Sequence, residues 1–594
     1  MLNENHGSKA EKPYPKITAA DAAVLGCILI VMLCGIGSYG LYEPHEGHFA
    51  GVGREMCISG DWITPHLNGA PYLNKPPLFY WIIATSYSLL GISEWTARFP
   101  LALIGFSGVL LAWHWARKLW GYEAGRVAAC MLATSIGWYL FAHQLLIDIL
   151  LCVLYLGCMY LLWRAIECRT QRWRWALFYF VLGLSTMAKG LIGLMFPIVV
   201  LFIYIAWRRD WKLTKEFCPG MGTSILLALT VPWLVLMEIR NPGSVEYMIV
   251  NEHFKRVIDT RWPPDYSGVK VSASMYLLLS AAWVAPWCLL LPQVAAFIRK
   301  KQTLPPEHQA EKDAVLLMFL GALLPVVTFL PMKSRLIYYG LPALPLFAIL
   351  ASGWWSRAKE DRIGARMGAL TFIVTGAVIL SALFWLPGRL KSIPDIIAAP
   401  GVLDCIPYLT VFMGLSLVGG GILLALKKTQ WSMAVMTICL GLAGLYSVTG
   451  FNAFDDVRSS KHLVENLRAK AGADCVWVSE GSKEIGASAG IAFYLGKNET
   501  GAARTVFILE AKMDDTHRAP PVFPGPRLNY LITPEELQNL WNENRPVLYV
   551  TDFQRTDWLN DYPVLPSGSL NLVPSANGGS RRVYANACAW KRIQ

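Results

Sequence analysis

Residues 41–80 concentrate the side chains of this chain that could do chemistry. The stretch, LYEPHEGHFAGVGREMCISGDWITPHLNGAPYLNKPPLFY, directly follows a long apolar run. Its ionisable groups are Glu43, His45, Glu46, His48, Arg54, Glu55, Asp61, His66 and Lys75. Carboxylates and imidazoles can transfer protons, and lysine and arginine can hold an anion. Because such groups are rarely placed next to lipid, we predict that the stretch forms the floor of an active site at a membrane surface.

The elements that must position these groups are membrane-spanning helices. Of all residues, 54% are hydrophobic and 16% are charged, and this charged share is well below that of a soluble domain. A span needs roughly 20 apolar residues, and the sequence contains about 13 such stretches. Their centres lie near residues 31, 108, 133, 154, 181, 199, 230, 285, 322, 344, 376, 415 and 441. We therefore predict an α-helical polytopic membrane protein whose bundle covers residues 21–454.

The loop charges predict which way this bundle faces. Lys and Arg favour cytoplasmic loops, and they prevail in the alternate loops on the side of the N-terminal tail, residues 1–20. We therefore expect a cytoplasmic N-terminus, an outer loop at 41–98 and an outer C-terminal segment. The tail lacks a small-residue cleavage site, which predicts a retained anchor. The net charge of +12 then reflects the anionic inner leaflet, and we expect no nucleic-acid partner.

Several basic residues depart from this rule because they fall on the expected outer side. They are Lys75, Lys189, Arg256, Lys333 and Arg335. Positive charge is unusual on that side of a membrane protein. We therefore expect these residues to recruit an anion.

Residues 455–594 are predicted to form a small outer α/β domain. CVWVS at 475–479, TVFIL at 505–509 and VLYVT at 547–551 have strand patterns, and 461–470 has helical spacing. Pro534–Asn542 begins like a helix, with Thr533 as its N-cap and proline in its first turn. Strands that alternate with helices are typical of an α/β unit.

The cysteines say little about function. Most of the thirteen fall in predicted spans, where cysteine behaves as a small apolar residue. Cys475 and Cys588 both fall on the outer side, so an oxidising compartment would allow a disulfide between them.

The chain resembles a known enzyme family in five segments. EPHEGHF at 43–49, with the pattern REM…GDW…KPPL…YW after it, is similar to the first outer loop of GT-C fold glycosyltransferases that use polyprenyl-phosphate sugars. The other matching segments are LID at 146–148, AKG at 188–190, NEHFKR at 251–256 and KSRLIYYGLP at 333–342. The sequence looks most like the bacterial lipid A aminoarabinose transferase group, with protein O-mannosyltransferases as more distant relatives. The resemblance implies the same span count and an outer C-terminal domain.

The loop departs from the family at one position. The family usually has Asp-Glu where this chain has His45-Glu46, and that Asp is most often given the catalytic role. Arg-Tyr is likewise replaced by His48-Phe49. The resemblance therefore implies Glu46 and Asp148, ahead of His45, as catalytic candidates. His48 and Arg54 are implied as loop or acceptor-binding residues.

The donor chemistry points to a group of cations. A sugar on a polyprenyl phosphate is already activated, so the enzyme must stabilise the departing phosphate. Side chains suited to this task are those of Lys75, Lys189, Arg256, Arg335 and Tyr339. A hydroxyl acceptor would also need a base, whereas a lipid A phosphate, with a second pKa near roughly 6, can attack already ionised.

Each assignment has a purely structural alternative. Glu46 could cap a helix over residues 47–56, and Lys75 could be an interfacial snorkelling lysine. Asp148 could pair with an outer arginine, and Lys189 could neutralise carbonyl groups at a helix break.

Histidines gathered on the outer side suggest a divalent metal, such as zinc, as a further hypothesis. His45, His48 and Glu46 would be its ligands. The histidines follow no HxH or HxxxH spacing, so hydrogen-bonded structural histidines are the alternative.

Two classes of function remain open. The first is a bacterial inner-membrane glycosyltransferase, expected to be a monomer, that moves a sugar from polyprenyl (undecaprenyl) phosphate to a periplasmic acceptor. That acceptor would be lipid A, another glycolipid, or a hydroxyl of a glycan or protein. The second is a transporter or flippase for lipid-linked sugars. A transporter should carry ionisable groups near mid-span and show paired halves, and the sequence favours the enzyme because its charges gather at one face.

Overall fold

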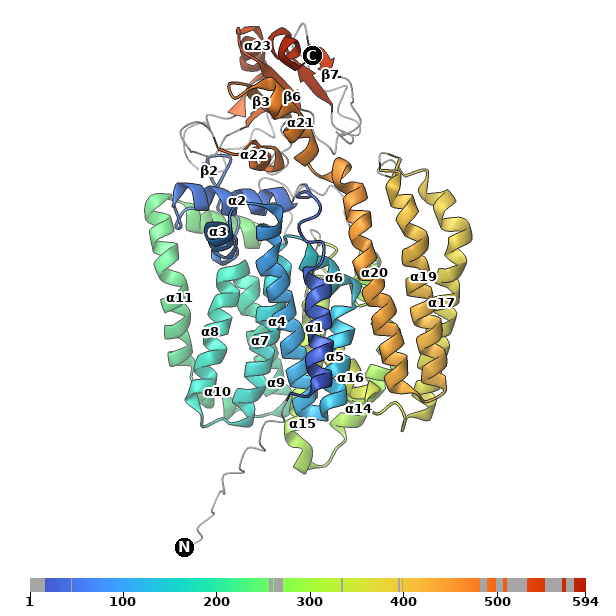
Figure 1. Ribbon diagram of the computed structural model, residues 1–594. Coiled ribbons are helices and arrows are strands. Elements are labelled where there is room, and N and C mark those ends of the chain that lie inside the picture. The colour runs from blue at the N-terminus through green and yellow to red at the C-terminus, as the bar shows by residue number, and fades with distance from the viewer. Residues whose placement is uncertain are drawn as a thin grey trace.

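The computed structural model describes most of the chain. The described residues are 17–43, 45–255, 260, 271–332, 335–393, 396–397, 399–480, 489–497, 506–509, 531–550, 569–572 and 582–593. Helices dominate, and most of them stand side by side as a bundle with a smaller unit above it (Figure 1).

The described helices are those of a multi-pass membrane protein. Seven of them are long and apolar enough to cross a membrane: α4 (Glu94–Trp120), α7 (Ile147–Glu167), α9 (Leu191–Arg208), α11 (Pro219–Arg240), α17 (Arg362–Leu390), α19 (Gly401–Ala425) and α20 (Thr429–Arg458). Two bent pairs raise the number to as many as nine among the described residues. One pair joins α5 (Tyr122–Ala133) to α6 (Ile136–His143) at 62°, and the other joins α13 (Ala273–Trp283) to Trp287–Gln302 at 98°. The predicted polytopic helical fold is confirmed at this level.

The remaining predicted centres fall on helices that are shorter or less apolar. These helices are α1 (Ala19–Leu33), α8 (Arg172–Lys189), α15 (Gln309–Thr328) and α16 (Ala343–Trp355). The centre near residue 285 falls at the break of a bent pair. A count of thirteen spans therefore stays a prediction.

Short elements fill the two ends of the bundle. At the end that faces the smaller unit, α2 (His45–Ser59) lies across the tops of the spans (Figure 1). It is followed by the two-stranded hairpin β1 (His66–Leu67) and β2 (Ala70–Pro71), and by α3 (Leu78–Leu90). The other short helices are α10 (Leu213–Glu216), α12 (Ser244–Glu246), the π-helix η1 (Tyr247–Lys255), the 3₁₀ helices η2 (Trp287–Leu290) and η3 (Pro306–His308), and α14 (Leu291–Gln302).

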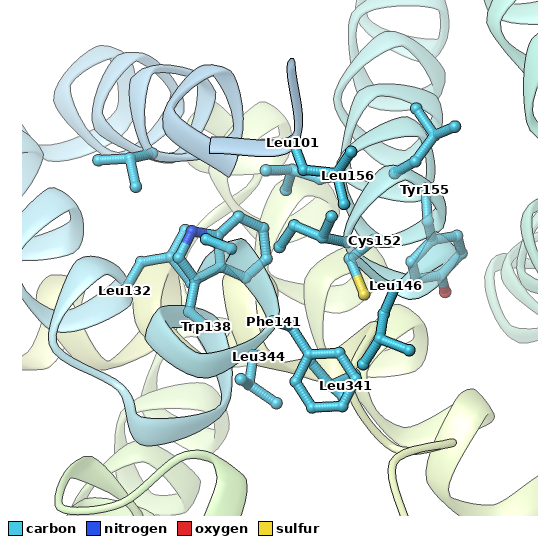
Figure 2. Close-up of a cluster of buried hydrophobic side chains, with 14 of the residues drawn as sticks. Leu101, Leu132, Trp138, Phe141, Leu146, Cys152, Tyr155, Leu156, Leu341 and Leu344 are labelled. Atoms are coloured by element: carbon cyan, nitrogen blue, oxygen red, sulfur yellow. The ribbon is translucent and has the colours of Figure 1, made fainter. Parts of the chain in front are cut away.

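The core beneath α2 holds the junction between α6 and α7. Figure 2 shows Trp138 and Phe141 of α6 directed toward Leu146 and Cys152 at the start of α7. All four side chains are buried. Gly108 of α4 permits this packing, because a Cβ there would lie 2.5 Å from the Trp138 ring. Close packing of this kind drives helix association in lipid, and here it fixes the first turn of α7.

The unit above the bundle contains a six-stranded sheet in the order β5-β4-β3-β6-β8-β7. Strands β5, β4, β3 and β6 are parallel, and β8 and β7 join antiparallel. The strands are β3 (Val476–Glu480), β4 (Phe507–Leu509), β5 (Leu531–Ile532), β6 (Val547–Val550), β7 (Leu570–Leu572) and β8 (Val583–Ala585). The helices are α21 (Lys461–Ala471), α22 (Ala489–Leu495), α23 (Pro534–Asn542) and α24 (Ala587–Ile593).

Local sequence signals in this unit hold in detail. The three predicted strands overlap β3, β4 and β6, whereas β5, β7 and β8 were not predicted. Helix α23 begins at Pro534 with Thr533 as N-cap. The Thr533 hydroxyl accepts the Glu536 N–H at 3.2 Å, and the Thr533 N–H donates to the Glu536 carboxylate at 2.8 Å. This reciprocal capping box satisfies two donors that a helix start leaves open.

The disulfide weighed between Cys475 and Cys588 does not form. The two thiols are not joined to each other in the structure. The Cys475 Sγ instead donates to the backbone carbonyl oxygen of Val476 at 3.6 Å.

Candidate active site

Two buried pairs of lysine and carboxylate mark the candidate site. The Nζ of Lys75 lies 2.7 Å from Oε2 of Glu252, and the Lys189 ammonium pairs with the carboxylate of Asp148. The Lys75 and Glu252 side chains are 16% and 0% exposed, and those of Lys189 and Asp148 are 10% and 7% exposed. Ionised groups are buried only at a high desolvation cost. The four residues are therefore placed there for a reason other than filling space.

The two pairs are connected through η1 and the break between α8 and α9. Gly190 at this break has φ +71°, and a Cβ there would lie 2.6 Å from Nε2 of His253. The sequence therefore needs glycine at this position on both conformational and spatial grounds. Because Lys189 precedes this glycine and Glu252 precedes His253, the contact brings the backbone segments that carry the two pairs close to each other.

Hydrogen bonds fix the tautomer of His253. Its Nε2 accepts the Leu191 N–H at 3.1 Å, so Nδ1 carries the proton and donates to the Met248 carbonyl oxygen at 2.8 Å. Burial lowers the pKa of His253 below its usual 6.5, and the nearby Lys75 lowers it further, although the Met248 bond and Glu252 raise it. The imidazole is therefore held neutral. A π-helix such as η1 is rare and often marks a functional site.

Tyr339 and Arg335 reach this region from the segment before α16. The Lys189 Nζ lies 5.6 Å from the centroid of the Tyr339 ring, within cation–π range. Arg335 donates to the backbone carbonyl oxygens of Met332 at 2.8 Å and Val271 at 3.0 Å. These two bonds tie Arg335 to its own segment and to the segment before α13, and neither is made to a residue of the lysine pairs. Arg256 and Lys333 lie outside the described residues.

Glu46 is held by an arginine that sequence reasoning missed. The Arg98 guanidinium donates to both of its carboxylate oxygens, at 2.8 and 2.7 Å. The same oxygens accept the backbone N–H groups of Leu145, at 2.7 Å, and Tyr42, at 2.8 Å. Glu46 thus joins α2 to the chain just before Asp148. An arginine within an apolar stretch is the signal that could have found this pair.

The two loop histidines of the predicted site differ in burial. His45 is exposed in the first turn of α2. His48 is buried, with its ring centroid 4.4 Å from that of Tyr72 and 5.4 Å from that of Phe49. Within the described part of the chain, no group of three or more His, Cys, Asp or Glu side chains could hold a metal ion.

Arg54 connects α2 to the unit above the bundle, and Glu55 connects α2 to the β1–β2 hairpin. Arg54 donates to the backbone carbonyl oxygens of Ala492, at 3.0 Å, and Gly496. Glu55 accepts the N–H groups of Asn68, at 2.6 Å, and Gly69, at 2.9 Å. Arg54 therefore contacts α22 and its end instead of either lysine pair.

The arrangement can hold an anion and accept a proton in one place. Two ammonium groups can bind phosphate oxygens, and the carboxylate beside each can serve as a base. The residues come from the loop after β2, α7, α8 and η1.

Several known proteins are similar to this chain in sequence. Residues 74–236 match the family model described as dolichyl-phosphate-mannose-protein mannosyltransferase. An undecaprenyl phosphate-α-4-amino-4-deoxy-L-arabinose arabinosyl transferase of Pseudomonas fluorescens is 28% identical over 65% of this chain and 67% of its own length. A protein of the same name from Aeromonas salmonicida is 28% identical over 59% of this chain and 64% of its own length.

A solved structure shares the fold over nearly the whole chain. It is that of ArnT from Cupriavidus metallidurans bound to undecaprenyl phosphate, with a TM-score of 0.77 and 22% identity. The match covers 96% of this chain and 98% of that one. Together, the family model, the relatives and the fold confirm the predicted resemblance to GT-C glycosyltransferases that use polyprenyl-phosphate sugars, including the bacterial aminoarabinose transferase group, and with it the enzyme class.

Proposed function

We propose that this chain is an integral-membrane glycosyltransferase that moves a sugar from a polyprenyl (undecaprenyl) phosphate carrier to lipid A. The observation that carries the proposal is the presence of two lysine–carboxylate pairs, Lys75–Glu252 and Lys189–Asp148, on segments that the hydrogen bond between Leu191 and His253 joins. Names of the relatives point to an aminoarabinose-type sugar.

The lysines would stabilise the leaving group. During transfer, the bond between the sugar anomeric carbon and the carrier phosphate oxygen breaks, and that oxygen takes the electron pair. Lys75 and Lys189 would bind the departing phosphate, with Arg256, Arg335 and Tyr339 as further members of the phosphate-binding group. Fixed donors in a water-poor site stabilise such developing charge strongly.

The acceptor would attack the same anomeric carbon. A lipid A phosphate is largely ionised near neutral pH, with a second pKa of roughly 6, and needs no base. Asp148 would then orient the Lys189 ammonium group and neutralise its charge when no phosphate is bound. The four hydrogen bonds that Glu46 accepts commit it to holding the loop, so we assign proton transfer, where it is needed, to Asp148 ahead of Glu46 and His45.

A hydroxyl acceptor is the second candidate. It is favoured by the family model, whose description names a protein mannosyltransferase. In that case Asp148 would take the hydroxyl proton as the new glycosidic bond forms.

A pure transporter of lipid-linked sugars is disfavoured by where the charges sit. Asp148 lies in the first turn of α7, and Lys189 lies in the last turn of α8. Transport pathways usually place ionisable groups near the membrane midplane.

We further propose a bacterial inner-membrane location with a cytoplasmic N-terminus, thirteen spans and a periplasmic active site in a monomer. Residues 455–594 would form a periplasmic α/β domain. In support, α1 begins at the end of the bundle opposite the sheet-containing unit (Figure 1), and that far end carries the Lys- and Arg-rich loops.

The proposal is tested on membrane lipids. Glycolipids would be extracted from bacteria with and without this chain, and from a strain carrying Lys189→Met, and weighed by mass spectrometry. We expect a glycosylated lipid A species that depends on the intact chain. Lys461→Met is the matched control, because Lys461 also forms an ion pair, with Glu94 at 2.9 Å, but lies in α21. If no glycolipid mass depends on the chain, the lipid acceptor is excluded.

A further inference from the structure

Glu252 raises a question that the proposed chemistry does not answer. Its side chain is fully buried and lies 2.7 Å from the Lys75 ammonium. A carboxylate at this distance neutralises much of the positive charge that the donor phosphate would need.

The phosphate and Glu252 must therefore compete. An ammonium group has three N–H donors and one unit of charge. Lys75 already donates one hydrogen bond to Glu252 and another to the Asn74 carbonyl oxygen at 2.9 Å. Because this one positive charge cannot neutralise both a carboxylate and a phosphate, a phosphate that binds Lys75 competes with Glu252 for that charge.

The backbone around Glu252 is anchored, so Lys75 is the group that can shift. His253, the next residue, bonds to Leu191 and to Met248. The Lys75 side chain, by contrast, is flexible by type and is the more exposed member of the pair.

We propose that Glu252 is a counter-ion that the carrier phosphate displaces from Lys75 and that takes Lys75 back when the product leaves. The inference rests on the proposed function. Glu252 is then a positioning residue that sets how tightly the site holds polyprenyl phosphate. Transfer leaves the carrier phosphate with its full charge, so a site without a competing anion would release it slowly, and product release often limits turnover.

A purely structural role for the Lys75–Glu252 pair predicts a different change in phosphate affinity. Removing one member of a buried ion pair leaves a charge uncompensated and destabilises the fold. If Glu252 only held Lys75 in place, its loss would leave phosphate affinity unchanged or weaker. Displacement predicts that its loss makes phosphate binding tighter.

The experiment compares wild type with Glu252→Gln, which removes the charge and keeps the shape. The probe is undecaprenyl phosphate added to the full-length protein in detergent, and the measured quantities are its Kd and the rise in Tm that it causes. We expect Kd to fall about tenfold or more, as the loss of a close competing charge implies. We also expect a lower Tm without lipid and a larger rise on adding it. An unchanged or higher Kd in Glu252→Gln overturns the inference.

Kinetics give a second readout. With the sugar-loaded donor, Glu252→Gln should show a lower donor KM, a lower kcat and a burst of product in the first turnover, because release becomes slower. If Glu252→Gln does not fold, Glu252→Asp pulls the carboxylate back by one methylene, and Kd should then fall to a smaller extent. A Kd for Glu252→Asp equal to that of wild type would then contradict displacement. If wild type itself neither binds undecaprenyl phosphate nor transfers sugar, the proposed function fails, and the role of Glu252 fails with it. If wild type binds and transfers but Glu252→Gln leaves Kd unchanged, only the role of Glu252 fails.

Discussion

The imidazole of His253 accepts a hydrogen bond from the backbone N–H of Leu191 at 3.1 Å. This bond fastens η1 to the start of α9, directly after Lys189 and Gly190. It requires an unprotonated Nε2, so the geometry of the site depends on the charge of one histidine.

Acid should therefore weaken both the fold and the activity through His253. Its folded pKa lies below 6.5, so as pH falls below 6.5 the unfolded chain takes up a proton before the folded chain does. Stability is lost across the window between 6.5 and the lower folded pKa. His253→Gln keeps an acceptor and cannot be protonated, so its Tm and kcat/KM should fall less between about pH 7 and 5.

The ratio of kcat/KM in His253→Gln to kcat/KM in wild type separates the effect of His253 from the titration of the acceptor. Ionisation of a phosphate acceptor changes the activity of both proteins alike, whereas Tm reports only the protein. If Tm falls equally with decreasing pH in wild type and in His253→Gln, the proposed role of His253 is contradicted.

Gly190 should tolerate no side chain. Gly190→Ala places a Cβ 2.6 Å from the His253 ring at a backbone φ of +71°, which displaces η1 from the α8–α9 break. We expect transfer activity to fall by at least about tenfold, since small displacements at a site cost that much or more. Gly220→Ala is the control, because a Cβ at Gly220 meets nothing within 4 Å. Equal activity of the two variants would refute the packing argument.

Breaking the ion pair between Glu46 and Arg98 should lower the stability of the fold and should have no direct effect on the transfer reaction. Both side chains are buried, and removal of one member of such a pair typically costs about 3–5 kcal/mol. Glu46→Ala should therefore unfold at a clearly lower temperature or denaturant concentration. Glu543 and Arg545 form an exposed ion pair, in which the Arg545 side chain is 42% exposed and the Glu543 side chain is 48% exposed. Glu543→Ala is the control, because loss of such a pair should change stability by about 0–1 kcal/mol. A Glu46→Gln protein of normal stability that no longer transfers would instead assign this carboxylate to proton transfer.

The sheet-containing unit should stabilise the hairpin that precedes Lys75. Asn68 donates to the Val506 carbonyl oxygen at 2.7 Å and accepts the Val506 N–H at 2.8 Å, with φ +55°. Asn68→Gly removes both bonds and keeps the backbone unstrained, for a loss of about 1–3 kcal/mol. Asn68→Ala should cost more, because alanine is disfavoured at positive φ. Thermal unfolding in detergent measures both losses of stability. Equal stability of wild type and Asn68→Gly would contradict a stabilising role for the two bonds between Asn68 and Val506.

Periodic and local signals carried most of the fold prediction. Apolar runs located the helices, and the Thr533–Pro534 start located α23 to the residue. The order of motifs predicts that Asp148, Lys189 and Lys75 belong to one site, which stays a prediction, and the structure pairs the first two directly.

Contacts between distant segments could not be predicted in this way. Within NEHFKR, the sequence indicated Arg256 as the residue that binds phosphate. The described contact to Lys75 comes instead from Glu252, 177 positions along the chain. No periodicity records such a pairing. The apolar stretch around Arg98 marks this arginine as unusual, but no pattern in the sequence identifies Glu46, 52 positions away, as its partner.

The central claim is that the lysine pairs hold a carrier phosphate while its sugar leaves. The most direct test gives purified protein undecaprenyl phosphate-aminoarabinose and lipid A in detergent and follows both lipids by mass spectrometry. We predict that wild type and Lys461→Ala convert lipid A to a species heavier by one aminoarabinose residue and release undecaprenyl phosphate. Lys75→Ala and Lys189→Ala, shown to be folded by Tm, should form no product. Near-normal turnover in both lysine variants would contradict the account.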